Sequence, residues 1–297
     1  MRRVSLVLFA TTALLAAIAS PARATNGYFA HGYGTHYKGI AGAGVALHLD
    51  SLAAATNPAA TAFLGDRFDV SLSAFSPDRY YTVSGNPSGY PGTFGLTPGE
   101  VRSDSRLFPV PALAGSWKAG EKGAFGVAVY GNGGMNTNWP TATFYAGSPT
   151  GVNLDQMFVA PTYAYKLGDK HALGVSAIGA LQWFKAEGVG SFADFSSDPS
   201  NPSDKGYAYA FGAGLRVGYL GEWSRYLSVG ASYQTKVAMG RFDRYAGLFA
   251  EQGGFDVPAN WTAGVASTRP RTSTSRWTCS RSSTRRWRRS GTRSSRT

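Results

Sequence analysis

Residues 25–60 of this chain have the sequence TNGYFAHGYGTHYKGIAGAGVALHLDSLAAATNPAA. The stretch is built from Gly, Ala and scattered aromatic residues, and it shows neither helical periodicity nor the alternation of a strand. A secretory signal precedes it directly: Arg2 and Arg3 form a charged start, residues 4–18 are apolar, and PARA at 21–24 supplies an A-x-A cleavage site. We therefore expect a signal peptide at residues 1–24 and a mature chain that begins at Thr25.

Composition narrows the class of protein. No apolar run after the signal is long enough for a transmembrane helix, so an exported chain of this kind is periplasmic, secreted or an outer-membrane β-barrel. The chain contains 38 Gly and 13% aromatic residues, but only 15% charged residues, against about 25% in a typical soluble domain. These values favour a protein wall with lipid on one side.

The net charge of +12 at pH 7 is unevenly distributed along the chain. Ten Arg and no acidic residue lie between positions 268 and 297, and the signal peptide contributes three more Arg. Residues 25–267 therefore carry a net charge of −1. This removes the argument for a nucleic-acid partner that a strongly basic chain would otherwise make.

From Arg67 onward, apolar residues alternate with small or polar ones, as in strands with one apolar face. We predict strands near 67–76, 106–118, 123–131, 155–167, 171–186, 206–220 and 226–241, and the start of an eighth near Pro258. The apolar faces end in Tyr or Trp, for example Tyr207 and Tyr219, and short charged turns alternate with long loops rich in Gly, Pro, Ser and Asn. Both features favour an outer-membrane barrel over a soluble β-sandwich or a periplasmic β-domain.

Three motifs near the N-terminus resemble the start of FadL-type transporters: NGYF at 26–29, GIAGAGVA at 39–46 and NPAA at 57–60. The similarity continues through residues 206–241 and ends with VPANWTAGVA at 257–266. Members of this family are outer-membrane carriers of long-chain fatty acids and other hydrophobic compounds. The resemblance implies an outer-membrane location and a 14-stranded barrel in which the N-terminal segment forms a plug, or hatch.

The expected fold is therefore all-β: a transmembrane antiparallel β-barrel with an N-terminal plug. We assign residues 25–66 to the plug and 67–266 to a partial barrel with about eight of the family's fourteen strands. Eight strands alone would close a barrel too narrow for a plug of this length. Residues 267–297 form a basic tail of Ser, Thr, Arg and Trp that contains Cys279, the only cysteine. Its composition is typical of a gene read out of frame; the alternative is a basic arm that binds nucleic acid or lipopolysaccharide.

Two sets of residues are candidate elements of the plug. The resemblance identifies Asn57, Pro58 and Ala59 as the hatch motif, and Pro58 fixes a rigid turn on physical grounds; the simpler interpretation is an ordinary Asn-Pro turn. A second set, Gly39, Gly42 and Gly44, is interpreted as close packing of the plug backbone against the wall. No strand precedes these glycines, which argues against a dinucleotide-binding fingerprint.

Arg216 and Lys236 are predicted on the lumen faces of neighbouring strands. Either side chain can pair with the carboxylate of a fatty acid, or with an acidic residue of the plug or wall such as Asp50 or Asp66. Phe29 of the N-terminal segment is a further candidate for contact with the ligand.

Two loop features remain open at this stage. The loop 242–257 carries four candidate ligand-contacting residues that could form an outer landing surface, because exposed apolar clusters tend to mark binding sites. These residues are Tyr245, Leu248, Phe249 and Phe255. The run GNGG at 131–134 either bends the wall, as in the lateral exit of the family, or begins a loop.

We predict a transporter, not an enzyme, which moves long-chain fatty acids or similar hydrophobic compounds by passive, plug-gated diffusion without a cofactor. The sequence contains no catalytic motif and no residues at metal-ligand spacing. Expected partners are hydrophobic small molecules (fatty acids or hydrocarbons) and outer-membrane lipid, with no nucleic acid, and we expect a monomer. The alternative is a general diffusion porin or a structural barrel, but porins favour charged constrictions, whereas the predicted lumen faces consist mainly of Gly, Ala, Ser and Tyr.

Overall fold

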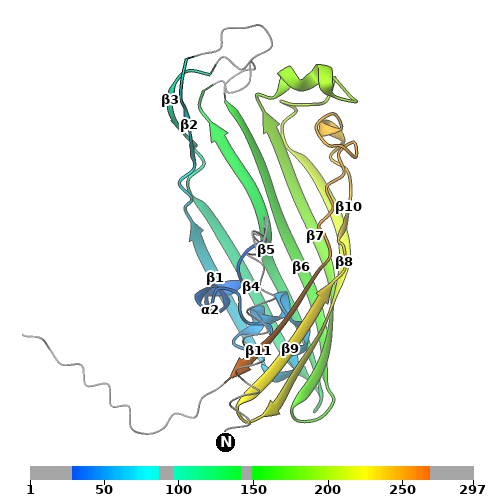
Figure 1. The fold of residues 1–297 in the computed structure, drawn as a ribbon. Coiled ribbons are helices and arrows are strands. Elements are labelled where there is room, and N and C mark those ends of the chain that lie inside the picture. The colour runs from blue at the N-terminus through cyan, green and yellow to red at the C-terminus, as the bar shows by residue number, and fades with distance from the viewer. Residues whose placement is uncertain (1–28, 87–95, 142–148, 268–297) are drawn as a thin grey trace, which may run out of the picture.

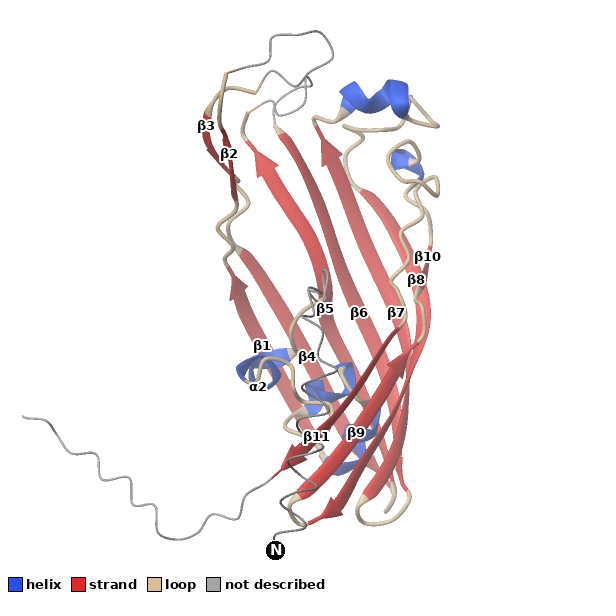
Figure 2. Ribbon diagram, viewed as in Figure 1, coloured by secondary structure: helices blue, strands red, loops and turns tan. Residues whose placement is uncertain are grey.

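The computed structural model describes residues 29–86, 96–141 and 149–267. Its main feature is a curled antiparallel sheet with the strand order β1-β4-β5-β6-β7-β8-β9-β11 (Figures 1 and 2). These strands are β1 (Arg67–Phe75), β4 (Phe108–Ala119), β5 (Gly123–Trp139), β6 (Thr150–Lys166), β7 (His171–Glu187), β8 (Ala208–Ser224), β9 (Leu227–Gln234) and β11 (Asn260–Ser267). The predicted all-β, antiparallel class is confirmed. The predicted signal peptide, residues 25–28 and the tail from 268 lie outside the described residues.

Smaller elements complete the fold. The hairpin of β2 (Tyr80–Val83) and β3 (Gly99–Arg102) lies within the connection between β1 and β4, and β10 (Ala238–Met239) pairs with β8. The short helical turns are α2 (Gly34–Gly39), η1 (Ser51–Ala55), η2 (Pro58–Phe63), η3 (Gly190–Phe195) and η4 (Asp243–Tyr245). Among the residues described, no helix is long and apolar enough to cross a membrane.

The two faces of the sheet differ as the alternation predicts. On β7, Leu173 and Val175 are exposed on the convex face, whereas Ala172 and Ser176 are buried on the concave face. The other strands repeat this arrangement. Large apolar side chains cover the outside, and mainly small or polar side chains line the inside, together with a few large buried ones such as Tyr130, Phe158 and Phe184. In an outer-membrane protein, the outer side chains of such a sheet face lipid.

One difference from the predicted strands lies in β5 and β6. We expected a long loop after residue 131, but β5 continues to Trp139 and pairs with β6 from Thr150 onward. The register shifts between Gly131 and Gly133, which marks a bulge inside the strand. The polar, glycine-rich sequence forms a strand here because its backbone pairs with that of β6. Its side chains alone do not indicate a strand.

A second difference follows β9, which ends at Gln234 and not near residue 241. Residues 235–259, which we call the strap, first continue along β8, with which β10 pairs, and then return before the chain enters β11 (Figure 1). A backbone bridge between Val237 and Val257 joins the two ends of the strap. Side chains of the strap, among them Phe242 and Tyr245, are buried against the concave face.

Residues 29–66, which we call the N-terminal segment, lie on the concave face in the lower half of Figure 1. They fill the end of the sheet where the turns between β6 and β7 and between β8 and β9 lie. Within the described part of the chain, β1 and β11 are the edges of the main sheet and do not pair with each other. The concave interior therefore contains two inserts, the N-terminal segment and the strap.

Candidate functional site on the concave face

The N-terminal segment folds through short, capped turns. Asp50 caps η1, because its Oδ1 accepts a hydrogen bond from the Leu52 amide at 2.9 Å. Asn57 caps η2 in the same way, because its Oδ1 accepts a hydrogen bond from the Ala59 amide at 3.1 Å. Pro58 occupies the first turn, where its missing N–H is not needed. Because η1 and η2 consist mainly of small buried residues, their backbone comes close to the wall.

The Asn57 side chain also joins the segment to the wall. It is fully buried, and its Nδ2 donates to the carbonyl oxygens of Val45 and Tyr219, each at 2.8 Å. Val45 belongs to the segment and Tyr219 to β8, so a single amide fixes two parts of the molecule against each other. An ordinary Asn-Pro turn needs only the cap, and the two additional bonds place the Asn-Pro-Ala motif at the main contact between segment and wall.

Close approach at this contact depends on glycines of the wall. A Cβ on Gly230 of β9 would overlap the carbonyl group of Val45. A Cβ on Gly174 of β7 would overlap the peptide bond between Pro58 and Ala59. The absence of side chains at these wall positions therefore makes room for the backbone of the segment.

The predicted packing role of Gly39, Gly42 and Gly44 is wrong. No heavy atom lies within 4 Å of a Cβ built on Gly39. Gly42 has a φ of +78° and turns the segment back on itself, and Gly44 makes room for the ring of Tyr37. The contacts of Gly42 and Gly44 thus lie within the segment. The prediction failed because two surfaces can pack closely when either of them lacks side chains, and the sequence of one surface does not show which it is.

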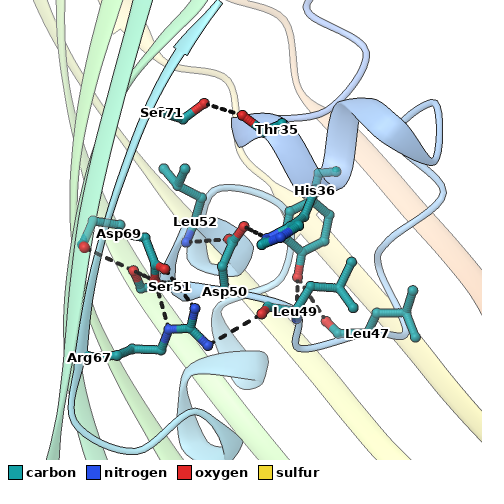
Figure 3. Close-up of polar contacts among 12 residues, drawn as sticks. Thr35, His36, Leu47, Leu49, Asp50, Ser51, Leu52, Arg67, Asp69 and Ser71 are labelled. Atoms are coloured by element: carbon teal, nitrogen blue, oxygen red, sulfur yellow. Dashed lines mark hydrogen bonds and ion pairs between the residues drawn. The ribbon is translucent and has the colours of Figure 1, made fainter.

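A polar network holds the segment to β1 at the edge of the sheet (Figure 3). Arg67 donates two hydrogen bonds to the carboxylate of Asp69, from Nε at 2.7 Å and Nη2 at 2.6 Å. Asp69 Oδ2 also accepts bonds from the amide and hydroxyl of Ser51, at 2.8 and 2.6 Å. Arg67 in turn reaches the carbonyl of Leu49 at 3.3 Å. Sequence analysis missed this network, since an Arg and an Asp at alternate strand positions give no signal of their own.

The helical turn α2 contributes two more contacts to this side (Figure 3). His36 Nδ1 lies 2.8 Å from Asp50 Oδ2. The hydroxyls of Thr35 and Ser71 are 3.0 Å apart and connect α2 with β1. Four of the contacts between the segment and β1 are therefore directed hydrogen bonds.

The Tyr37 ring closes the loop between α2 and η1. Its hydroxyl donates to the Leu47 carbonyl at 3.3 Å and accepts from the Leu49 amide at 3.1 Å. Burial raises the pKa of the Tyr37 hydroxyl far above its ordinary value. The group therefore stays neutral and can both donate and accept.

The start of the segment lies against the bulge of β5. Phe29 forms a backbone bridge with Gly133, and the Ala30 amide donates to the Asn132 carbonyl at 3.1 Å. The Tyr33 hydroxyl donates to Asn132 Oδ1 at 3.0 Å. Phe29 itself packs against the buried apolar cluster in the middle of the interior. Of the two interpretations of GNGG at 131–134, the structure shows an irregular strand and not the start of a loop.

Arg216 is buried on the concave face of β8, as its strand position predicts. Its Nη1 donates to the Tyr130 hydroxyl at 3.0 Å and contacts the Ala54 carbonyl at 3.4 Å, and its Nη2 donates to Gln234 Oε1. Ala54 belongs to η1, so Arg216 touches the N-terminal segment. No ion pair of Arg216 occurs within the described residues, and all three partners are neutral.

Lys236 differs from its prediction. It lies beyond the end of β9, in the strap, and its side chain is 61% exposed. Its Nζ forms an ion pair with Asp256 Oδ2 at 2.7 Å. The predicted lumen position is wrong because the strand ends 2 residues earlier, at Gln234.

Neither acid that we considered as a partner for the two cations binds them. Asp50 pairs with His36, as described above. Asp66 accepts a hydrogen bond from the Lys118 amide at 2.7 Å and thereby fixes the start of β1 against β4. Arg216 is thus left with neutral partners, and Lys236 with an acid of its own loop.

The strap folds inward around Phe184 of β7. Its ring centroid lies 5.5 Å from that of Phe242 and 5.0 Å from those of Tyr245 and Phe249. Phe255 continues the cluster, 5.7 Å from Phe249. The predicted exposed landing surface is therefore wrong for Tyr245, which is fully buried, whereas Leu248 remains 37% exposed. Phe184 was missed, although its even position on β7 places it on the concave face.

The described part of the chain contains no group of three His, Cys, Asp or Glu residues placed to hold a metal ion. The described residues offer instead an apolar interior, one buried cation and two inserts whose contacts with the wall are noncovalent. Such a site can bind and release a ligand.

Comparison with known proteins agrees with this geometry. The sequence model described as "Outer membrane protein transport protein (OMPP1/FadL/TodX)" matches residues 13–268. No curated protein matches the chain. Two solved structures share the fold: the toluene transporter TodX of Pseudomonas putida (16% identity, TM-score 0.61) and the toluene transporter TbuX of Ralstonia pickettii (18% identity, TM-score 0.57).

The alignments cover 82% and 80% of this chain, and 68% of the chain of each of these two structures. At this identity the likeness to the solved structures shows the fold. The match to the family model covers most of the chain and therefore shows membership. This outer-membrane protein belongs to the OMPP1/FadL/TodX family of outer membrane transport proteins.

Proposed function

We propose that this protein moves hydrophobic compounds, long-chain fatty acids among them, passively across the outer membrane, and that residues 25–66 act as its plug. One observation carries the proposal. The described part of this segment occupies the concave interior and is attached there by hydrogen bonds and packing, so that it can be displaced and can return. Transfer of an alkyl chain into the apolar interior contributes about 0.8 kcal/mol per CH₂, so binding needs no covalent step.

Residues of the interior and the strap have distinct proposed roles. Phe29, Tyr245, Phe249 and Phe255 line an apolar path, and Leu248 stands at its exposed outer end. Ligand would pass the aromatic cluster of the strap before it reaches the plug.

Arg216 is the proposed contact for a carboxylate at the bottom of this path. Arg216 is buried, and all its partners among the described residues are neutral, so they do not compensate the charge of its guanidinium group. A buried charge of this kind favours the binding of an anion. Its contact with the Ala54 carbonyl lets a bound carboxylate compete with the plug for the same cation. Lys236 is a weaker candidate, since Asp256 already neutralises it at the outer side.

A reversible cross-link tests the gate. Val45 Cγ1 lies 2.9 Å from a Cβ built on Gly264 of β11, which places a Val45→Cys/Gly264→Cys pair within reach of a disulfide. The pair is made with Cys279→Ser, which removes the only native cysteine. We expect uptake of oleate and toluene to fall about tenfold or more when the pair is oxidised, and to recover on reduction. The matched control is Gly264→Cys alone with Cys279→Ser, whose uptake is independent of oxidation. Equal uptake by the oxidised and reduced pair would show that the segment is not a gate.

The alternative, a porin or structural barrel without a hydrophobic site, makes a different prediction. A porin conducts ions and small hydrophilic solutes in planar bilayers, and hydrophobic compounds do not block this conductance. Our proposal predicts low ion conductance in the purified protein and co-purification of fatty acid or detergent. The concave face favours the transporter, because its strands carry mainly small side chains and, among the residues that the structure describes, Arg216 is the one buried cation.

A further inference from the structure

Two glutamines stand opposite each other on the concave face, above the N-terminal segment. Gln156 of β6 and Gln182 of β7 form a cross-strand pair in the register of the sheet. Side chains of such directly opposed residues start about 4.5–5.5 Å apart at Cβ. Gln156 is 3% exposed and Gln182 is fully buried, so neither amide can rely on bulk water.

Each amide uses only one of its polar atoms. Gln182 Nε2 donates to the Phe255 carbonyl of the strap at 3.1 Å, which fixes the orientation of this amide, and Gln182 Oε1 has no partner in the described structure. Gln156 Oε1 accepts from Asn132 Nδ2 at 2.9 Å, and Gln156 Nε2 has no partner there. A buried donor and a buried acceptor therefore remain vacant on adjacent side chains, which is unfavourable unless a ligand or water completes them.

The pair lies between two apolar clusters of the interior. Leu154 and Phe184 lie on one side of it and belong to the aromatic cluster below the strap. Phe158 and Ala180 lie on the other side and belong to the cluster above the N-terminal segment. A hydrophobic molecule that passes between the clusters meets the two vacant amide atoms on the way.

We propose that Gln156 and Gln182 bind the hydroxyl group of neutral hydrophobic compounds such as phenols and alkanols. The hydroxyl oxygen accepts a hydrogen bond from Gln156 Nε2, and the hydroxyl proton is donated to Gln182 Oε1. A hydrocarbon leaves both atoms unpaired, and a carboxylate meets the repulsive oxygen of Gln182. The inference rests on the proposed function and adds a preference for one class of ligand, at a place distinct from Arg216 of β8.

Three ligands of similar shape test the preference on the purified full chain. p-Cresol carries the hydroxyl, p-xylene replaces it by a methyl group, and 4-methylanisole keeps the oxygen but cannot donate. Dissociation constants are measured by calorimetry for the unchanged protein and for Gln156→Met and Gln182→Met, which preserve side-chain volume. We expect the preference for p-cresol over p-xylene to fall about tenfold in each variant, as for the loss of a buried hydrogen bond. Phe158→Leu is the control, because it changes the apolar lining two residues away and should leave the ratio unchanged.

The outcomes separate the two proposals. A ratio that falls in both Met variants and holds in Phe158→Leu supports the glutamine pair. If the unchanged protein binds p-xylene and its preference for p-cresol survives in both Met variants, the vacant atoms hold water and the inference is overturned, while the transport proposal stands. Binding of neither compound would overturn both. A variant-free measurement remains if the Met variants do not fold: p-cresol must bind the unchanged protein more tightly than 4-methylanisole, and the reverse order overturns the inference.

Discussion

The two inserts of the concave interior differ in what is added to their hydrogen bonds with the wall. The N-terminal segment is held by directed hydrogen bonds to fixed wall positions, among them Asn57 to β8 and Ser51 to Asp69 of β1, and by glycines that exclude wall side chains. The strap is held by the backbone pairing of β10 with β8, by hydrogen bonds such as that from the Tyr245 hydroxyl to the Gly206 carbonyl, and by aromatic packing around Phe184. We therefore expect the loss of a polar contact to release the segment, and the loss of the Phe184 ring to loosen the strap.

The largest effect is expected for Phe184→Ala. Removal of a buried Phe side chain costs about 3–5 kcal/mol, and the loss falls on the strap because its rings meet at Phe184. Hydrogen exchange should show faster exchange of amides in 242–257 and unchanged exchange in the N-terminal segment. Phe195→Ala, which removes an aromatic ring that is 87% exposed, is the control and should stay within about 0.5 kcal/mol. Equal loss of protection in both inserts would show that they form one cooperative unit, and it would contradict the prediction that Phe184 supports the strap alone.

Asn57→Ala should release the N-terminal segment. The change leaves the carbonyls of Val45 and Tyr219 and the Ala59 amide without their side-chain partner, at a cost of about 2–3 kcal/mol. Limited proteolysis should then cut within residues 29–66 while the strap stays protected. Asn57→Asp sharpens the test: it keeps the cap but places a carboxylate against two carbonyl oxygens, so we expect at least as large an effect. A protected segment in the Asp variant would show that the cap alone holds it.

Gly230→Ala tests the glycine contact without removing any hydrogen-bonding group. The new Cβ would overlap the Val45 carbonyl, and overpacking of this kind costs about 1–3 kcal/mol. We expect faster hydrogen exchange around residue 45. Gly179→Ala is a matched strand control, since its Cβ would make only an ordinary contact of 3.8 Å with the Val159 carbonyl. Identical hydrogen exchange in the Gly230→Ala and Gly179→Ala variants would show that close packing of the segment does not depend on Gly230.

The smallest effect is expected from acid at the base of the strap. The Lys236 ammonium, together with the Met239 amide, holds the pKa of the Asp256 carboxyl below its ordinary value. The ion pair therefore stabilises the strap fully at pH values above the ordinary pKa of Asp, about 3.9. This stabilisation is lost as the pH falls through the lowered pKa of Asp256. Opening of the strap should increase slightly as the pH is lowered from 6 to 3. It can be measured by quenching of tryptophan fluorescence or by hydrogen exchange. In Asp256→Asn this rise should be absent, and the same rise in both proteins would assign it to another group.

Much of the fold was predictable because strand alternation is a local property. Each side chain of a strand points to the face opposite its neighbour, so Leu173, Val175 and Phe184 can be assigned to faces without knowledge of the neighbouring strands. The Asn-Pro-Ala motif was identified for a similar reason, since capping and the proline constraint act within a few residues. The buried position of Arg216 follows from the same alternation.

Only the tertiary structure decided what these faces contact. Whether 132–139 forms loop or strand depends on pairing with β6, and whether Lys236 faces the lumen depends on where β9 stops. The close packing that Gly39, Gly42 and Gly44 were expected to provide is instead supplied by Gly174 and Gly230 of the wall, which lie far away in the sequence. The two vacant glutamine atoms appear only when β6 and β7 lie side by side. Contacts between distant segments depend on the shapes of both partners, and a single stretch of sequence describes only one of them.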